Sequence, residues 1–165
     1  MTENAKNKQN LKELVETKNF VEHLSIDCVI FGFHKDKLKV LLLKYHDLDL
    51  WCVPGGFIFN DENLNDAAAR TLYERTHLSN VYLEQFYTFG DVRRTENNVH
   101  QKLLENKNIA VEKNHWIHQR YISVGYFALV DYTLTYTFPD SFNEVCRWFD
   151  ISELPELAFD HKEMI

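Results

Sequence analysis

The chain has 165 residues, of which 45% are hydrophobic and 14% aromatic, and a formal net charge of −7 at pH 7. These values are typical of one globular domain with a sizeable core. The acidic balance disfavours direct nucleic-acid binding. Three cysteines without a CxxC spacing indicate reduced thiols. Since neither a signal peptide nor an apolar run of membrane-spanning length is visible, we expect a cytoplasmic protein without a membrane partner.

The N-terminal residues 1–23 predict a polar tail and a short amphipathic helix, ahead of a domain over residues 24–165. Two β-rich runs, SIDCVIFGF and KLKVLLLKY, flank a polar turn from His34 to Lys37 and predict a hairpin. A short strand, LWCV, then leads into a Pro-Gly-Gly loop.

A helix is expected to begin near Leu64, followed by strands over VYLEQFYTFG, RYISVGYFALVDY and NEVCRWFDI. RYISVGYFALVDY is nearly continuous in apolar residues, which predicts a central strand buried on both faces. The last residues, SELPELAFDHKEMI, predict one or two further helices. Because strands and helices alternate without a regular βαβ rhythm, the expected class is α+β, a mixed sheet between helices.

Residues 91–118 form a polar, mixed insertion that is long for a loop in a compact domain. Part of it, VHQKLLENK, has a helical pattern. The insertion is either a ligand lid or a tolerated surface insertion. His115 and His118 have a spacing that suits a metal on a helix, but no acidic or cysteine partner is close in sequence.

The stretch from 56 to 78 carries glycine, acidic, basic and apolar residues at a long, defined spacing. It resembles the Nudix box, whose pattern is G, five residues, E, seven residues, then R-E-U-x-E-E-x-G-U, with U apolar. The matching residues are Gly56, Glu62, Arg70, Leu72, Glu74 and Leu78. The resemblance implies a Nudix fold.

Three positions depart from the box: Thr71 and Arg75 replace glutamates, and His77 replaces the glycine. In the family, three carboxylates on one helix face hold Mg²⁺, which neutralises a diphosphate and activates water. Here only Glu74 remains, beside a permanently charged guanidinium. We therefore expect no catalytic residue.

The residual box residues are Glu62, Arg70 and Glu74, and Glu62 and Glu74 are the candidate metal ligands. Each also has a structural interpretation. Glu62 can hold its loop by accepting backbone N–H groups, and Arg70 with Glu74 can form a helical i,i+4 salt bridge. Arg75 can be an ordinary solvated charge.

A second resemblance is to the Nudix-related transcriptional regulators. Their box reads R-x-L-x-E-x-T-G-L, followed by yleQ-x-y-t-F-G and R-x-I-S-V-x-Y-x-A-L. The corresponding segments here are Arg70–Leu78, Tyr82–Gly90 and Arg120–Leu129. The resemblance implies a homodimeric sensor of a small-molecule effector, such as L-arabinose or ADP-ribose. It also implies a C-terminal winged helix-turn-helix that binds DNA, which is expected from the family but is not in this chain.

In such regulators the ligand cleft lies between the box loop, the YTFG strand and the RYISVGY strand. Arginines there suit a phosphate, aromatic rings suit a base or sugar face, and polar groups suit hydroxyls. The candidate ligand-binding residues are Asp27, Gln85, Phe89, Arg93, Arg94 and Arg120. Asp27 on an inner strand needs a partner if it is buried, and Phe89 has an alternative place in the core.

The sequence thus predicts an effector-sensing domain of a transcriptional regulator that binds a sugar or nucleotide sugar without hydrolysing it and needs no cofactor. The alternative is a Mg²⁺-dependent hydrolase of nucleoside diphosphate derivatives, with metal ligands drawn from Glu62, Glu74, Asp91 or Glu96. A third possibility is a scaffold or interaction domain without a small ligand.

Overall fold

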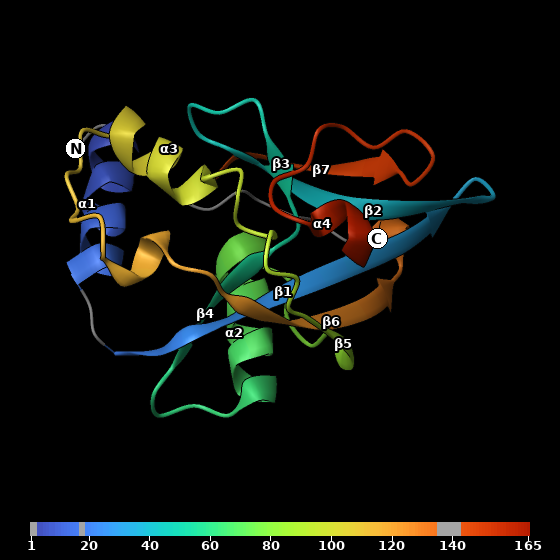
Figure 1. Ribbon diagram of the computed structural model, residues 1–165. Coiled ribbons are helices and arrows are strands. Elements are labelled where there is room, and N and C mark those ends of the chain that lie inside the picture. Colours follow the sequence, from blue (N-terminus) through green and yellow to red (C-terminus); the bar gives the residue numbers. More distant parts are fainter. Residues whose placement is uncertain (1–2, 17–18, 135–142) are drawn as a thin grey trace.

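A seven-stranded mixed sheet forms the centre of the computed structural model, which describes residues 3–16, 19–134 and 143–165 (Figure 1). The strands are β1 (Phe20–His34), β2 (Lys37–Tyr45), β3 (Trp51–Cys52), β4 (Gly55–Phe59), β5 (Glu84–Phe89), β6 (Ile122–Val130) and β7 (Asn143–Asp150). The helices are α1 (Glu3–Glu16), α2 (Leu64–Thr76), α3 (Val99–Asn106) and α4 (His161–Met164), with 3-10 turns η1 (Trp116–His118) and η2 (Tyr132–Leu134). The expected α+β class is confirmed.

The sheet has the strand order β3-β2-β1-β6-β5, with β4 paired to β1 and β7 paired to β2. β1 and β2 form the predicted antiparallel hairpin. β1 runs parallel to β6, which lies between β1 and β5, as its continuous apolar sequence predicted. β5 is paired on one side only, and its side chains are exposed except for Phe89.

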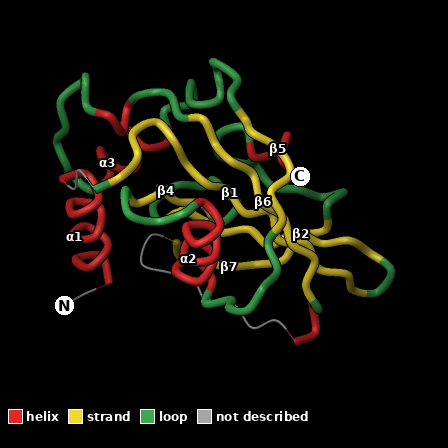
Figure 2. The backbone as a smooth tube through the Cα atoms, turned by 90° about the horizontal axis from the view of Figure 1, so that it is seen from below, coloured by secondary structure: helices red, strands yellow, loops and turns green. Residues whose placement is uncertain are grey.

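The two faces of the sheet are covered by different elements. Ile26 and Ile30 of β1 pack with Leu72 of α2, whereas Val29 lies in a second cluster with Met164 of α4. Since neighbouring residues of a strand point to opposite faces, α2 and α4 cover opposite faces of the sheet. Figure 2 shows α2 against the strands and α1 set apart from them.

The insertion at 91–118 packs against the N-terminal helix rather than forming a loose loop. Leu11 and Val15 of α1 share an apolar cluster with Leu104, Ile109 and Ile117. α1 and α3 accordingly lie side by side (Figure 1). The helical pattern predicted within the insertion corresponds to α3. Segments far apart in sequence therefore bury each other's apolar faces at one end of the sheet.

The N-terminal boundary differs from the sequence prediction. Helix α1 already includes Glu3, where a tail was expected, and the domain start placed at residue 24 falls inside β1. The early start of β1 reflects a long-range contact: Phe20 pairs with Phe59 of β4, and their rings stack at 5.0 Å between centroids. None of the helices in the described residues has the length and apolarity to cross a membrane.

Candidate functional site

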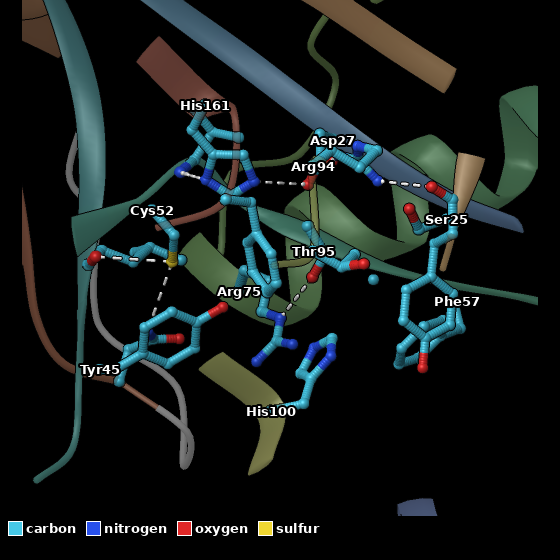
Figure 3. A pocket seen from close by; sticks show the side chains of 17 residues that line it. Ser25, Asp27, Tyr45, Cys52, Phe57, Arg75, Arg94, Thr95, His100 and His161 are labelled. Atoms are coloured by element: carbon cyan, nitrogen blue, oxygen red, sulfur yellow. Dashed lines mark hydrogen bonds and ion pairs between the residues drawn. The ribbon is translucent and has the colours of Figure 1, made fainter. Parts of the chain in front are cut away.

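A pocket lies where the last turn of α2 meets the inner strands of the sheet (Figure 3). Its walls come from separate segments of the chain, represented by Asp27, Gly55, Arg75, His100 and His161. The cavity volume is about 70 Å³, which holds a few water molecules. Ligand pockets usually measure about 300–1,000 Å³. A nucleotide-sized ligand must therefore displace some of these side chains or extend beyond the pocket.

Asp27 of β1 is a buried charge in this pocket, with 6% of its surface exposed. The Ser123 hydroxyl donates to its Oδ2 at 2.5 Å, the Arg94 Nη2 lies 3.4 Å from the same oxygen, and His161 Nε2 lies 3.5 Å from Oδ1. Burial by itself raises the pKa of Asp27, but His161, Arg94 and Ser123 outweigh it and hold the pKa at about 2. The carboxylate is therefore ionised and fixed at neutral pH.

Arg94, from the insertion, holds two carboxylates at once. Its Nε and Nη2 donate to the two carboxylate oxygens of Asp160, each at 3.0 Å, while Nη2 also reaches Asp27. Its Nη1 donates to the Tyr121 carbonyl at 3.2 Å. The side chain is only 3% exposed. The charge of Arg94 is therefore balanced inside the protein by acidic partners from β1 and from the residue before α4.

His161 is held in one tautomer by its neighbours. The Val53 N–H donates to His161 Nδ1 at 3.3 Å, so this nitrogen carries no proton. The Nε2 therefore carries the proton and faces Asp27 (Figure 3). The C-terminal helix thus contributes a hydrogen-bond donor to the pocket.

His100 of α3 lies in an aromatic wall of the pocket. Its ring centroid is 5.1 Å from that of Phe159 and 5.6 Å from that of Tyr121. Burial lowers the pKa of His100 to about 4, although the nearby Asp27 acts in the opposite direction. The imidazole is neutral at pH 7 and can donate or accept a hydrogen bond.

Three box residues form an ion-pair network outside the pocket. Arg70 contacts Glu62 through Nη2 at 2.5 Å and Nε at 2.9 Å, and Glu74 through Nη1 at 2.9 Å. Glu62 also accepts the Phe59 N–H at 2.7 Å. The hydrogen bond from Arg70 is the main cause that lowers the pKa of Glu62. These residues thus fix the loop between β4 and α2, as their structural interpretations anticipated.

Arg75 enters the pocket from α2. Its Nε donates to the Gly55 carbonyl at 2.9 Å, and its guanidinium lies close to His100 in Figure 3. Thr71, one turn earlier, is buried and packs against Gly56, where an added Cβ would lie 3.0 Å from Thr71 Oγ1. The box helix therefore presents a cation to the pocket, and the alternative of a simply solvated Arg75 does not describe this geometry.

Comparison with known proteins agrees with the box spacing: the NUDIX domain family matches residues 21–165. The chain belongs to the NUDIX family. It is 27% identical over 149 residues to the ADPR-responsive transcriptional repressor NtrR of Acinetobacter baylyi, a match that covers 86% of this chain and 51% of the repressor. The chain thus spans about half the length of this curated relative.

Solved NUDIX structures share the fold. The NUDIX domain of Shewanella oneidensis NrtR, crystallised with ADP-ribose, has a TM-score of 0.66 and 27% identity, covering 93% of this chain and 92% of that chain. An ADP-ribose pyrophosphatase from Streptococcus suis has a TM-score of 0.53 and 20% identity, covering 86% of this chain and 84% of that one. The latter likeness shows the fold alone.

The residues of this NUDIX box do not fit the Mg²⁺ site of the family pattern. Of the three helix positions, Thr71 is buried, Glu74 pairs with Arg70 outside the pocket, and Arg75 is a cation. In the described ranges, no group of three or more His, Cys, Asp or Glu side chains is placed to hold a metal ion. The spacing of His115 and His118 suited a metal on a helix, but His115 accepts the Ile117 N–H through Nδ1 at 3.3 Å.

The structure places two of the six candidate ligand residues, Asp27 and Arg94, in the pocket. The other four lie elsewhere: Gln85, Phe89, Arg93 and Arg120. Phe89 is 8% exposed and packs in the core, whereas Gln85 is exposed on β5. Arg93 is exposed, and Arg120 donates to a main-chain carbonyl just after β5. A ligand role for these four stays a prediction.

Sequence reasoning did not assign Arg75, Asp160 or His161 to the ligand site. Arg75 had a usable signal, because it stands at a box position that normally faces the metal and diphosphate. Asp160 had none, since its partner Arg94 is 66 residues away. A buried Asp27 did indicate that a compensating donor must exist, but not which residue supplies it.

Proposed function

We propose that this NUDIX domain senses a nucleotide sugar of the ADP-ribose class and does not hydrolyse it. The observation that carries the proposal is the position of Arg75, a cation in the pocket where the box pattern has a metal-binding glutamate. Without a carboxylate face on α2, Mg²⁺ lacks the site from which the family pattern activates water. The ADP-ribose bound by the NrtR domain of Shewanella oneidensis supports this ligand class.

The domain is proposed to serve a transcriptional regulator, as the ADPR-responsive repressor relative suggests. Its acidic net charge of −7 disfavours DNA contact through these residues. In this proposal, operator DNA is bound by a winged helix-turn-helix outside the 165 residues, and the domain acts as a homodimer in the cytoplasm. Light scattering of the purified domain measures the proposed dimer directly.

The decisive experiment measures binding and turnover together. Purified domain is titrated calorimetrically with ADP-ribose and with L-arabinose, and the same samples are incubated with Mg²⁺ and analysed by chromatography. Binding of intact ADP-ribose without release of AMP supports the proposal. Mg²⁺-dependent cleavage that Glu74→Gln abolishes would establish the hydrolase alternative instead. If L-arabinose binds more tightly than ADP-ribose, the ligand class proposed here is wrong and the effector is a free pentose.

A further inference from the structure

Strand β5 leaves one edge of the sheet open. It pairs with β6 along one side, and along its other side no strand of the described residues is paired with it (Figure 1). The backbone N–H and C=O groups on that side are therefore available to a strand from another molecule. Proteins often block such an edge with lysine or proline, and Glu84–Phe89 contains neither. A bulge between Gln85 and Tyr87 keeps the available ladder short, so side chains must supply most of any contact.

Aromatic side chains gather on one face of this edge. Gly125 of β6 has no side chain, and a Cβ there would lie 2.8 Å from both Phe86 and Phe89. These two rings therefore rest on the β6 backbone. The ring centroid of Phe127 lies 5.9 Å from that of Phe86. The centroid of Tyr87 lies 4.9 Å from that of Phe89, and Tyr87 is 62% exposed. Exposed aromatic side chains beside a free strand edge are typical of protein interfaces.

The two ends of the edge differ in shape. Beside the first residues of β5 lies a groove of about 490 Å³, whose apolar lining includes Val81, Tyr82 and Leu129. Leu129 is 67% exposed there. Towards the other end, Tyr87 and Val92 are large apolar side chains exposed to solvent. One end of the edge is thus hollow, and the other carries side chains of the kind that could fill the hollow.

The two ends also differ in charge. Glu84, at the start of β5, is exposed and has no ion-pair partner in the described part of the chain. Just past the end of the strand, Arg120 donates to the Gly90 carbonyl, while Asp91 and Arg93 there pair with each other. Two such edges placed in parallel would bring like charges together, which is destabilising. An antiparallel pair instead brings Glu84 of each copy to the Arg120 end of the other.

We propose that this edge is an interface between two copies of the chain, whose β5 strands pair antiparallel about a two-fold axis. The inference rests on the homodimer of the proposed function and names the surface that forms it. A two-fold axis brings the first end of each strand to the last end of the other. Backbone pairing, the fit of apolar side chains into the groove, and opposite charges are then each satisfied twice. A different protein would have to supply all three features independently, so a second copy is the occupant that these observations favour.

The test measures self-association by analytical ultracentrifugation over a range of concentrations. Wild type is expected to sediment as a dimer. Tyr87→Lys and Leu129→Lys are each expected to raise the dimer dissociation constant about 100-fold or more, because a substitution acts twice in a two-fold dimer. Tyr73→Lys is the matched control, since Tyr73 is an exposed tyrosine on α2, and it is expected to leave the constant unchanged. Circular dichroism shows that each variant is folded, and either of the two interface variants suffices.

A charge exchange tests the antiparallel orientation. Glu84→Arg and Arg120→Glu are each expected to weaken the dimer about 10-fold, because each places like charges together at both ends of the interface. The double variant restores opposite charges and is expected to regain most of the lost affinity. Weakening by both single variants without recovery in the double variant would show that these two residues do not meet, and that the antiparallel arrangement is wrong.

The possible results separate this inference from the proposed function. A wild-type domain that stays monomeric at every concentration overturns both the interface and the homodimer, whereas ADP-ribose binding is measured independently and decides the sensing function. A dimer that Tyr87→Lys and Leu129→Lys leave intact overturns this interface alone, because the homodimer must then use another surface. Equal weakening by Tyr73→Lys also overturns it, since the effect is then not specific to the β5 edge.

Discussion

The guanidinium of Arg94 donates to both carboxylate oxygens of Asp160, each at 3.0 Å, across 66 residues of sequence. This forked pair joins the 91–118 insertion to the residue that precedes α4. Because Arg94 also contacts Asp27 on β1, insertion, sheet and C-terminal helix meet at one side chain. The contact lies at the pocket and ties the insertion to the start of α4.

Arg94→Met is expected to lower the free energy of unfolding by about 3–5 kcal/mol, because it leaves buried carboxylates without their cation. Urea denaturation measures the change. Arg93→Met is the control, since the neighbouring Arg93 side chain is 73% exposed. Equal stability of the two variants would show that the Arg94 network contributes nothing to folding.

His77→Gly is expected to raise the free energy of unfolding by about 0.5–1 kcal/mol. His77 ends α2 with φ of 60°, a left-handed conformation that glycine adopts without strain. The substitution restores the glycine of the box pattern, at the cost of a ring contact with Tyr73. Thermal denaturation checks it, and a lower melting temperature would mean that the ring contact outweighs the backbone strain.

Thr71→Val is expected to stabilise the fold by about 1 kcal/mol, because Thr71 Oγ1 is a buried polar atom without a hydrogen-bond partner in the described structure. Valine keeps the shape and removes the unsatisfied group. Thr71→Ser is the comparison, since it retains the hydroxyl and removes a methyl group. If valine destabilises as much as serine, the hydroxyl has a partner that stabilises the protein.

Stability is expected to fall as the pH drops from 6.5 towards 4, because the unfolded chain takes up a proton that folded His100 resists. The pKa of His100 is lowered from 6.5 to about 4 by burial, so the loss is at most about 3 kcal/mol. Denaturation across this range should give a flatter curve for His100→Asn.

A second loss of folding stability is expected at lower pH, where Asp27 becomes protonated. Its pKa is lowered from 3.8 to about 2, so the stabilisation is present above 3.8 and disappears as the pH falls towards 2. The two windows barely overlap. If His100→Asn follows the wild-type curve between pH 6.5 and 4, the acid sensitivity in that range belongs to other groups.

Local patterns in the sequence determined the family and most elements. The box spacing indicated the NUDIX family. The helix beginning at Leu64 and the apolar strand β6 were predictable because the pattern of apolar residues that indicates a helix or a strand is contained within the segment itself. The ion pair of Arg70 with Glu74 was equally local, since Glu74 lies one helical turn away.

The tertiary structure decided which charges meet. Asp27 required a partner, but its partners Arg94 and His161 lie 67 or more residues away in the sequence. Contacts over such separations produce no local sequence pattern from which they could be predicted. It also decided that Phe89 packs in the core and that Arg75 turns into the pocket, because exposure depends on which elements cover a face. The sequence alone showed the NUDIX fold and the loss of two glutamates from the box, whereas only the tertiary structure showed that Arg75 lies in the pocket.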